Sequence, residues 1–193
     1  MVCSEMKLER GVYGAEMLVR VLMTAALLLT PPGMAAAQEP TPLEQFLLQY
    51  RCLVVDRLER IYATGDPEKY QDEYLIIDIP PHPETYVQCL FYAKKKLYCE
   101  AASGFFLNAA NEPRTMRLPA GSIAALARLG FSTDDSNGNF RLDIDIADPP
   151  DFNAIADLML KALHDAYGAD ADTKLRFQAP YAERATRKCV PTS

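Results

Sequence analysis

The chain has no tryptophan and only two histidines among its 193 residues. So few imidazoles exclude a histidine-rich metal site and exclude several independent acid–base sites. Basic side chains are also outnumbered, because 20 Lys and Arg stand against 26 Asp and Glu, which gives a net charge of −6. Proteins that bind nucleic acids usually carry the opposite sign. The composition therefore predicts no nucleic-acid partner.

The sequence also lacks the short motifs that carry much enzyme chemistry. It contains no C-x-x-C, no H-E-x-x-H, no G-x-S-x-G and no glycine-rich phosphate loop, which argues against redox, zinc-dependent, serine-nucleophile and nucleotide-dependent chemistry. His82 lies between two prolines and His164 lies beside Asp165, and no nucleophile motif accompanies either histidine. Because catalysis needs converging acid, base and stabilising groups, we predict that the protein is not an enzyme and has no catalytic residue, cofactor or metal.

One segment has part of the pattern of a calcium loop. Asp135, Asn137 and Asn139 occupy its first three ligand positions. Phe140 stands where the loop needs glycine, and Ile146 stands where it needs a bidentate carboxylate. These departures exclude an EF-hand, and a polar turn followed by a solvated strand face explains the segment more simply. A looser calcium site is an alternative, with the candidate ligands Asp134, Asp135, Asp143 and Asp145.

No apolar run near the N-terminus is long enough to span a bilayer. Residues 21–29 form a run of nine, whereas a spanning helix needs about 20. Arg20 precedes this run, and the alanines at 35–37 form the small-x-small pattern that leader peptidase reads. We therefore predict a signal peptide cleaved near Ala37, a periplasmic or secreted protein, and no stable membrane anchor.

The predicted organisation has three parts. Residues 1–37 are an N-terminal extension and leader, residues 38–180 a single domain, and residues 181–193 a tail. Residues 1–16 precede Met17, which begins a complete leader by itself, as expected if the start codon was assigned too far upstream. Cleavage leaves about 156 residues, which can bury close to 70% of the extended chain's surface. A core is therefore expected without help from metals.

Four of the five cysteines follow the predicted cleavage site, namely Cys52, Cys89, Cys99 and Cys189. An even number in an oxidising compartment favours disulfides, and three pairings are open. Cys89 and Cys99 share the apolar parity of two adjacent strand-like runs, so one candidate is a bridge across a hairpin, which leaves Cys52 for Cys189. The alternative is that Cys52, Cys89 and Cys99 are small buried hydrophobic residues.

Apolar periodicity predicts an α+β fold. Three- and four-residue spacing predicts helices over residues 41–63, 119–129 and 152–167. Alternation and β-branched content predict strands over residues 74–79, 86–93, 97–107 and 140–146, with a further strand at 173–178 as an option. The order α-β-β-β-α-β-(β)-α, with the optional C-terminal strand, is typical of an antiparallel sheet packed against two long helices.

Five segments of this pattern resemble the YbjN-like and type III secretion chaperone-like domains. They are YVQ at 86–88, LYCEAAS at 97–103, LARLGF at 126–131, NF at 139–140 and ALHDAYG at 162–168. The resemblance covers about residues 70–177 and implies a leading helix, an antiparallel sheet, a long closing helix and binding of peptides or protein segments. It brings no catalytic residues, and the leader marks an exported variant of a group typified by cytoplasmic chaperones.

A domain of this kind binds an extended segment on a sheet face or at a sheet edge. The candidate contacts lie on the parity of the hairpin opposite its apolar face, with Phe105 or Phe106 beside them. They are Gln88, Leu90, Tyr92, Tyr98 and Glu100. The alternative is that these side chains form ordinary cross-strand pairs or pack beneath a helix.

The sequence thus predicts an exported, non-enzymatic domain that binds a protein or peptide segment, as a chaperone-like or inhibitory partner. A homodimer is compatible with this prediction. Two alternatives stay open at this point. One is a small periplasmic hydrolase that uses carboxylates such as Glu100 and Asp78, and the other is a calcium-stabilised structural module of the cell envelope.

Overall fold

The computed structural model describes residues 39–65, 72–92, 94–107, 117–184, 186 and 189. The predicted leader with its cleavage site lies outside these residues, as does most of the chain beyond residue 184. Within the described ranges, no helix has both the length and the apolar character needed to cross a bilayer.

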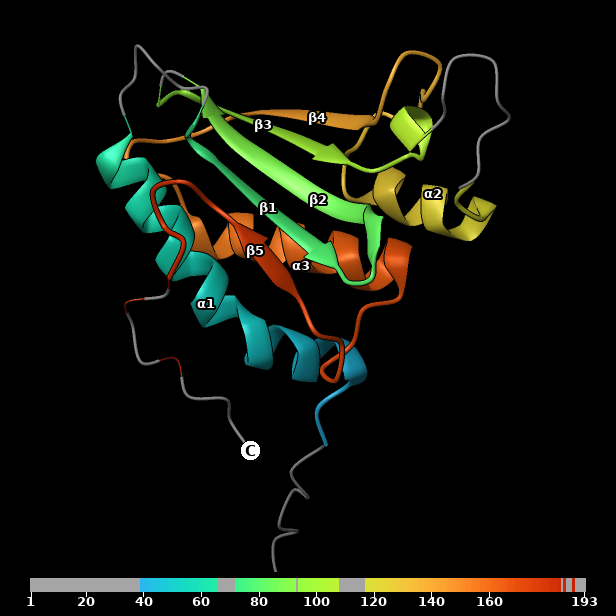
Figure 1. Cartoon of the computed structure of the whole chain (residues 1–193), viewed down its shortest axis with the longest axis horizontal. Coiled ribbons are helices and arrows are strands. Elements are labelled where there is room, and N and C mark those ends of the chain that lie inside the picture. The colour runs from blue at the N-terminus through green and yellow to red at the C-terminus, as the bar shows by residue number, and fades with distance from the viewer. Residues whose placement is uncertain are drawn as a thin grey trace, which may run out of the picture. The chain divides into compact units, whose positions relative to one another are not determined.

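The described chain forms an α+β fold, as predicted (Figure 1). Its helices are α1 (Pro42–Thr64), α2 (Ala120–Arg128) and α3 (Phe152–Tyr167), with a short 3-10 turn η2 (Phe105–Leu107). Its strands are β1 (Tyr74–Ile79), β2 (His82–Tyr92), β3 (Lys96–Ala101), β4 (Phe140–Asp145) and β5 (Arg176–Gln178). They form one sheet in the order β4-β3-β2-β1-β5, and every neighbouring pair is antiparallel.

The ends of α1 follow from local chemistry. Thr41 and Glu44 form a capping box, and Pro42 occupies the first turn, where its missing N–H is not needed. The helix ends at Gly65, where a Cβ atom would collide with the side chain of Glu73. A larger residue at position 65 would therefore require the Glu73 side chain to move.

The core lies between the sheet and the two long helices. Figure 1 shows α1 and α3 side by side on the same face of the sheet, and Arg51 of α1 binds Asp157 of α3 with an Nε–Oδ1 distance of 2.5 Å. The largest fully buried side chains come from both layers and include Phe46, Leu58, Ile61, Leu75, Ile77, Phe91, Leu97, Phe140, Leu160 and Leu163. The short helix α2 packs against α3.

The predicted strand over residues 97–107 is wrong in its second half. Strand β3 ends at Ala101, and residues 105–107 form the 3-10 turn. Gly104 has a φ of 82°, a backbone conformation that breaks the extended run. The sequence pattern missed this turn because the apolar pair Phe105 and Phe106 continues the β-like composition.

Candidate functional site

The five side chains predicted to contact a peptide lie together on the uncovered face of the sheet. In the ladder between β2 and β3, Gln88 pairs with Glu100 and Leu90 pairs with Tyr98. The residues between them, including Cys89 and Cys99, are buried against the helices. Tyr92 is 45% exposed, whereas the other four are partly buried. Phe105 and Phe106 belong to η2 and not to the hairpin.

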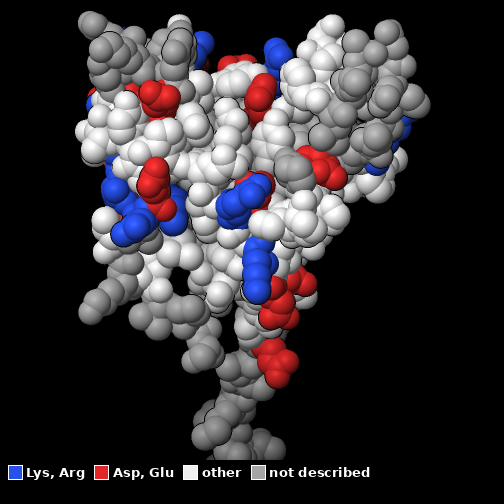
Figure 2. All heavy atoms as spheres, in the orientation of Figure 1, with Lys and Arg blue, Asp and Glu red and all other residues white. Residues whose placement is uncertain are grey.

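Polar groups on this open face bind one another. The Tyr98 hydroxyl donates to Glu100 Oε1 at 2.6 Å, and Arg141 Nε lies 3.8 Å from the same oxygen. Burial and this hydrogen bond raise the pKa of the Tyr98 phenol well above its ordinary value. Over the part of the surface in view in Figure 2, basic and acidic side chains are interspersed.

The cysteines form two pairs in the structure. Cys89 and Cys99 lie directly opposite each other in the β2–β3 ladder and are joined by a disulfide. Cys52 of α1 is joined to Cys189, which is 137 positions away in the sequence. The first bond lies inside the core, whereas the second fastens the C-terminal segment to the outside of α1.

The carboxylates considered for a hydrolase occupy separate hydrogen-bonded groups. Glu100 accepts from Tyr98, and Asp78, which is 2% exposed, accepts from Arg176 Nε at 3.0 Å and from Gln178 Nε2 at 3.0 Å. The ladders put Asp78 opposite Tyr86 and not in the row of Glu100. The arrangement is typical of ion pairs and hydrogen bonds that hold strands together.

The acidic turn considered for calcium shows local bonds instead. Asp134 accepts a hydrogen bond from the backbone N–H of Ser136 at 3.0 Å, as in an Asx turn. Nowhere in the described ranges do three or more His, Cys, Asp or Glu side chains gather in a way that could hold a metal ion.

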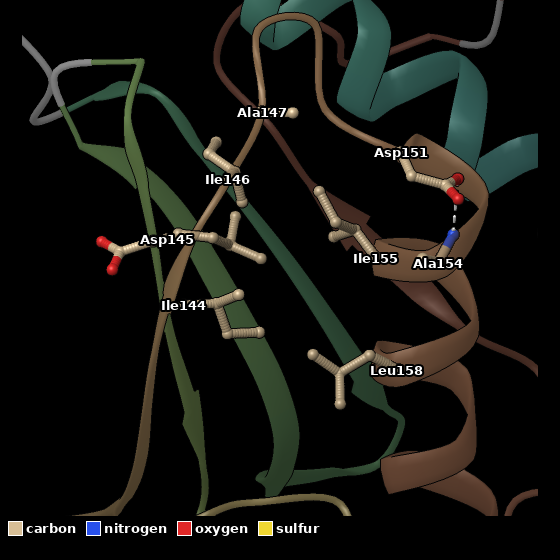
Figure 3. Close-up of a pocket in the computed structure, with 9 residues that line it drawn as sticks. Ile144, Asp145, Ile146, Ala147, Asp151, Ala154, Ile155 and Leu158 are labelled. Carbon is tan, nitrogen blue, oxygen red and sulfur yellow. Dashed lines mark hydrogen bonds between the residues drawn. The ribbon is translucent and has the colours of Figure 1, made fainter.

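A groove that the sequence did not reveal lies between β4 and α3. Its volume is about 400 Å³. Figure 3 shows Ile144 and Ile146 on one wall facing Ile155 and Leu158 of α3, while the carboxylate of Asp145 points away from the groove. The remaining lining residues are Leu97, Ala147, Asp151 and Ala154. The walls are thus mainly aliphatic.

Strand β4 forms the edge of the sheet beside this groove. The backbone N–H of Ser132 donates to the carbonyl of Arg141 at 2.7 Å, which shows that Arg141 directs its peptide groups away from β3. Because this direction repeats every second residue, Asp143 and Asp145 also present their N–H and C=O groups outward. Among the described residues, no backbone hydrogen bond reaches the outward groups of these two aspartates.

Two contacts fix the loop that closes one end of the groove. The carboxylate of Asp151 caps α3 by accepting from Ala154 N–H at 3.0 Å (Figure 3). The Tyr62 hydroxyl of α1 donates to Asp148 Oδ1 at 2.8 Å, and burial together with this hydrogen bond raises the pKa of Tyr62 to about 12. The loop is therefore held by both long helices.

The groove had a sequence signal, although an ambiguous one. Arg141, Asp143 and Asp145 alternate with the apolar residues of β4, and charged residues at every second position are a common protection of edge strands. The same alternation fits any half-buried strand. Only the position of β4 in the sheet distinguishes an edge strand from another half-buried strand.

Comparison with known proteins gives one match. No curated protein and no solved structure matches the chain. A family model, TY-Chap3, described as T3SS (YopN, CesT) and YbjN peptide-binding chaperone 3, matches residues 50–181. The match covers most of α1 and every strand of the sheet, and it confirms the resemblance inferred from the five sequence segments. The chain therefore belongs to this family of peptide-binding chaperones.

Proposed function

We propose that this domain is exported and binds an extended protein or peptide segment at the edge of β4, above the groove, as a chaperone-like or inhibitory partner. The observation that carries the proposal is the combination of an edge with outward peptide groups and an aliphatic groove directly beside it. An added strand gains affinity from main-chain hydrogen bonds and selectivity from pockets for alternate side chains.

In the proposed complex, each part of the site has its own role. The peptide groups of Asp143 and Asp145 would bond to the added strand. Every second side chain of that strand would enter the groove between Ile144 and Leu158, because side chains alternate between the two faces of a sheet. The volume of about 400 Å³ lies in the range of natural ligand sites, roughly 300–1,000 Å³.

The open face is the competing surface for the same segment. Its candidates Gln88, Leu90, Tyr92, Tyr98 and Glu100 share one side of β2 and β3. The hollow found on this face, next to Gln88, has a volume of about 230 Å³ and polar walls that include Asp78 and Arg176. It is smaller than the groove, and the two charged residues in its wall are already paired with each other. The edge of β4 is therefore the better site.

Export is supported by the leader pattern and by the two disulfides, since such bonds persist mainly in oxidising compartments. The test is mass spectrometry of the protein from a periplasmic fraction, before and after reduction. The proposal expects an N-terminus at Gln38 and a mass gain of two hydrogens for each bridge. An unprocessed chain in the cytoplasm with free thiols would overturn the export part of the proposal.

The binding site is tested with substitutions at the edge, in the groove and on the open face. The probe is a fluorescent, end-capped peptide of about seven residues, a common strand length, that alternates valine with threonine. Asp143→Pro removes an outward N–H at a position where an edge strand tolerates proline, and Leu158→Asp puts a charge into the groove. Each is expected to weaken binding at least about tenfold, or 1.4 kcal/mol.

Two matched variants make this test specific. Asp143→Ala keeps the N–H that proline removes, and Leu90→Ser changes the open face while it leaves the groove intact. Both are expected to bind the valine–threonine peptide within about twofold of wild type, which is a small difference on the free-energy scale. A strong loss in Leu90→Ser with little change in Leu158→Asp would move the site to the open face.

A further inference from the structure

We infer that the segment bound at β4 alternates apolar side chains with basic ones. The inference rests on the proposed function and adds the chemistry of the ligand. It starts from the charges beside the groove. Asp143 and Asp145 project from the outer side of β4, Asp151 lies at the start of α3, and Asp148 lies in the loop between them.

Basic groups also lie at the Asp145 end of β4, because Lys95 belongs to the turn before β3, Lys96 begins that strand, and the Lys95 carbonyl accepts from Ile146 N–H at 2.9 Å. Lys96 Nζ lies 3.9 Å from Asp145 Oδ1, but the lysine side chain is 58% exposed and the aspartate side chain 89% exposed. Exposed pairs of this kind interact weakly because water and salt screen them. Arg141 lies closest to Glu100 of β3, at 3.8 Å. On the face opposite the helices, β4 therefore carries two exposed carboxylates, Asp143 and Asp145, between Arg141 at one end and the lysines of the β2–β3 turn at the other.

Because side chains alternate along a strand, the two faces of an added strand would meet different surroundings and favour different residue types. Successive side chains of an added strand point to opposite sides of the sheet. Those on the helix side meet the aliphatic groove walls formed by Ile144 and Leu158. Those on the other side lie within about 5 Å of the cross-strand positions of Asp143 and Asp145, where opposite charges attract and like charges repel. Apolar residues suit the first set, and lysine or arginine suits the second.

A second copy of the chain fits this edge poorly. Ser132 already occupies the outward carbonyl of Arg141, so an antiparallel pair of two β4 strands would be centred on residues 143–145. That register places the aspartates of one copy opposite the aspartates of the other, and directly opposed like charges destabilise a ladder. The charge on the edge thus disfavours pairing between copies and favours a basic partner.

The test compares three end-capped peptides on the purified protein, in which valine alternates with lysine, threonine or glutamate. At low salt, the lysine peptide is expected to bind about tenfold tighter than the glutamate peptide, with the threonine peptide between them. Added salt of about 1 M, which shortens the screening length to about 3 Å, is expected to reduce the difference. Reversal of the edge charge in the double variant Asp143→Lys, Asp145→Lys is expected to reverse the order of the peptides.

A control variant separates the edge from the net charge of the protein. Asp172→Lys with Glu183→Lys changes the net charge equally at exposed positions on the β5 side of the molecule, and it is expected to keep the wild-type order. Reversal in this variant as well would overturn the inference, because the preference would then come from overall charge. Equal binding of the three peptides overturns the inference but leaves the proposed function intact, whereas no binding of any peptide overturns both.

Discussion

The two edges of the sheet differ in how the chain treats them. Strand β5 has three residues, and the segment after it folds back along α1, where Cys189 is bonded to Cys52. Strand β4 has six residues and borders an aliphatic groove. The chain beyond β5 is fastened to α1 by a disulfide and by hydrogen bonds, whereas among the described residues the outward backbone of β4 is paired only at Arg141, through Ser132. Under the proposed function, the edge of β4 is the one that receives a ligand.

A network of polar contacts ties β5 and the chain beyond it to β1 and α1. Asp78 binds Arg176 and Gln178, while the guanidinium of Arg57 lies 4.3 Å from the centre of the Phe177 ring. Further along the chain, Thr186 donates to the buried carboxylate of Asp56 through its N–H and its hydroxyl. Such networks fix a single arrangement when their members are satisfied.

The largest loss of stability is expected when the Cys52–Cys189 disulfide is removed. Cys52→Ala with Cys189→Ala opens a loop with a separation of 137 residues, for which chain entropy gives a loss of up to about 5 kcal/mol in the free energy of unfolding. Cys89→Ala with Cys99→Ala opens a separation of only 10 residues, and the same relation gives about 3 kcal/mol. Urea unfolding measures both. A smaller loss of stability in the Cys52, Cys189 variant than in the Cys89, Cys99 variant would contradict the importance assigned to the disulfide that fastens the C-terminal segment.

Tyr62 holds the loop beside the groove at the β4 edge, because its hydroxyl donates to Asp148. Its pKa is raised from 10.0 to about 12, so the unfolded chain loses this proton first as the pH rises. The contribution of this tyrosine to the free energy of unfolding is fully present below about pH 10, and about 3 kcal/mol of it is lost as the pH approaches 12. Tyr62→Phe has no such proton, so its urea midpoint is expected to fall less than that of wild type over this range. Parallel curves for the two proteins would refute the assignment.

The next largest loss of stability is expected when the hydrogen bonds between Asp78 and β5 are removed. Asp78→Ala removes the acceptor for Arg176 and Gln178, and lost hydrogen bonds between charged groups cost about 2 kcal/mol. The loss is expected below the value for a fully buried pair, because the Arg176 side chain is 55% exposed. Amide hydrogen exchange in β5 should increase in parallel with the loss of stability. Asp143→Ala on the open edge is the control, with an expected change within about 0.5 kcal/mol.

The sequence was sufficient for features that depend on neighbouring residues. The capping box at Thr41 placed the start of α1, and the shared parity of Cys89 and Cys99 put both on one face of the hairpin. It also put Leu90 and Tyr98 together on the opposite face. Each of these inferences needs only the period of a helix or a strand.

Features that depend on the order of strands were beyond the sequence pattern. Strand β4 lies at one edge because it pairs only with β3 in the sheet, although about 40 residues separate the two strands in the sequence. Strand β5 lies at the other edge and pairs with β1, the first strand in the sequence. The groove then exists because Ile144 and Leu158, which lie on different elements, face each other. Local periodicity shows that each is apolar and does not show which surface it meets.

The smallest effect on stability, and the most direct test of the contrast between the edges, comes from neutralising the open edge. Asp143→Asn with Asp145→Asn is expected to change the free energy of unfolding by no more than about 0.5 kcal/mol, because both side chains are exposed. It removes the charge that opposes pairing between copies, so we expect self-association to increase relative to wild type, as measured by sedimentation velocity. Asp172→Asn with Glu183→Gln changes the net charge equally on the β5 side and is expected to leave the association state unchanged. If the two double variants sediment alike, the carboxylates of β4 do not protect the edge, and the difference between the two edges must have another physical cause.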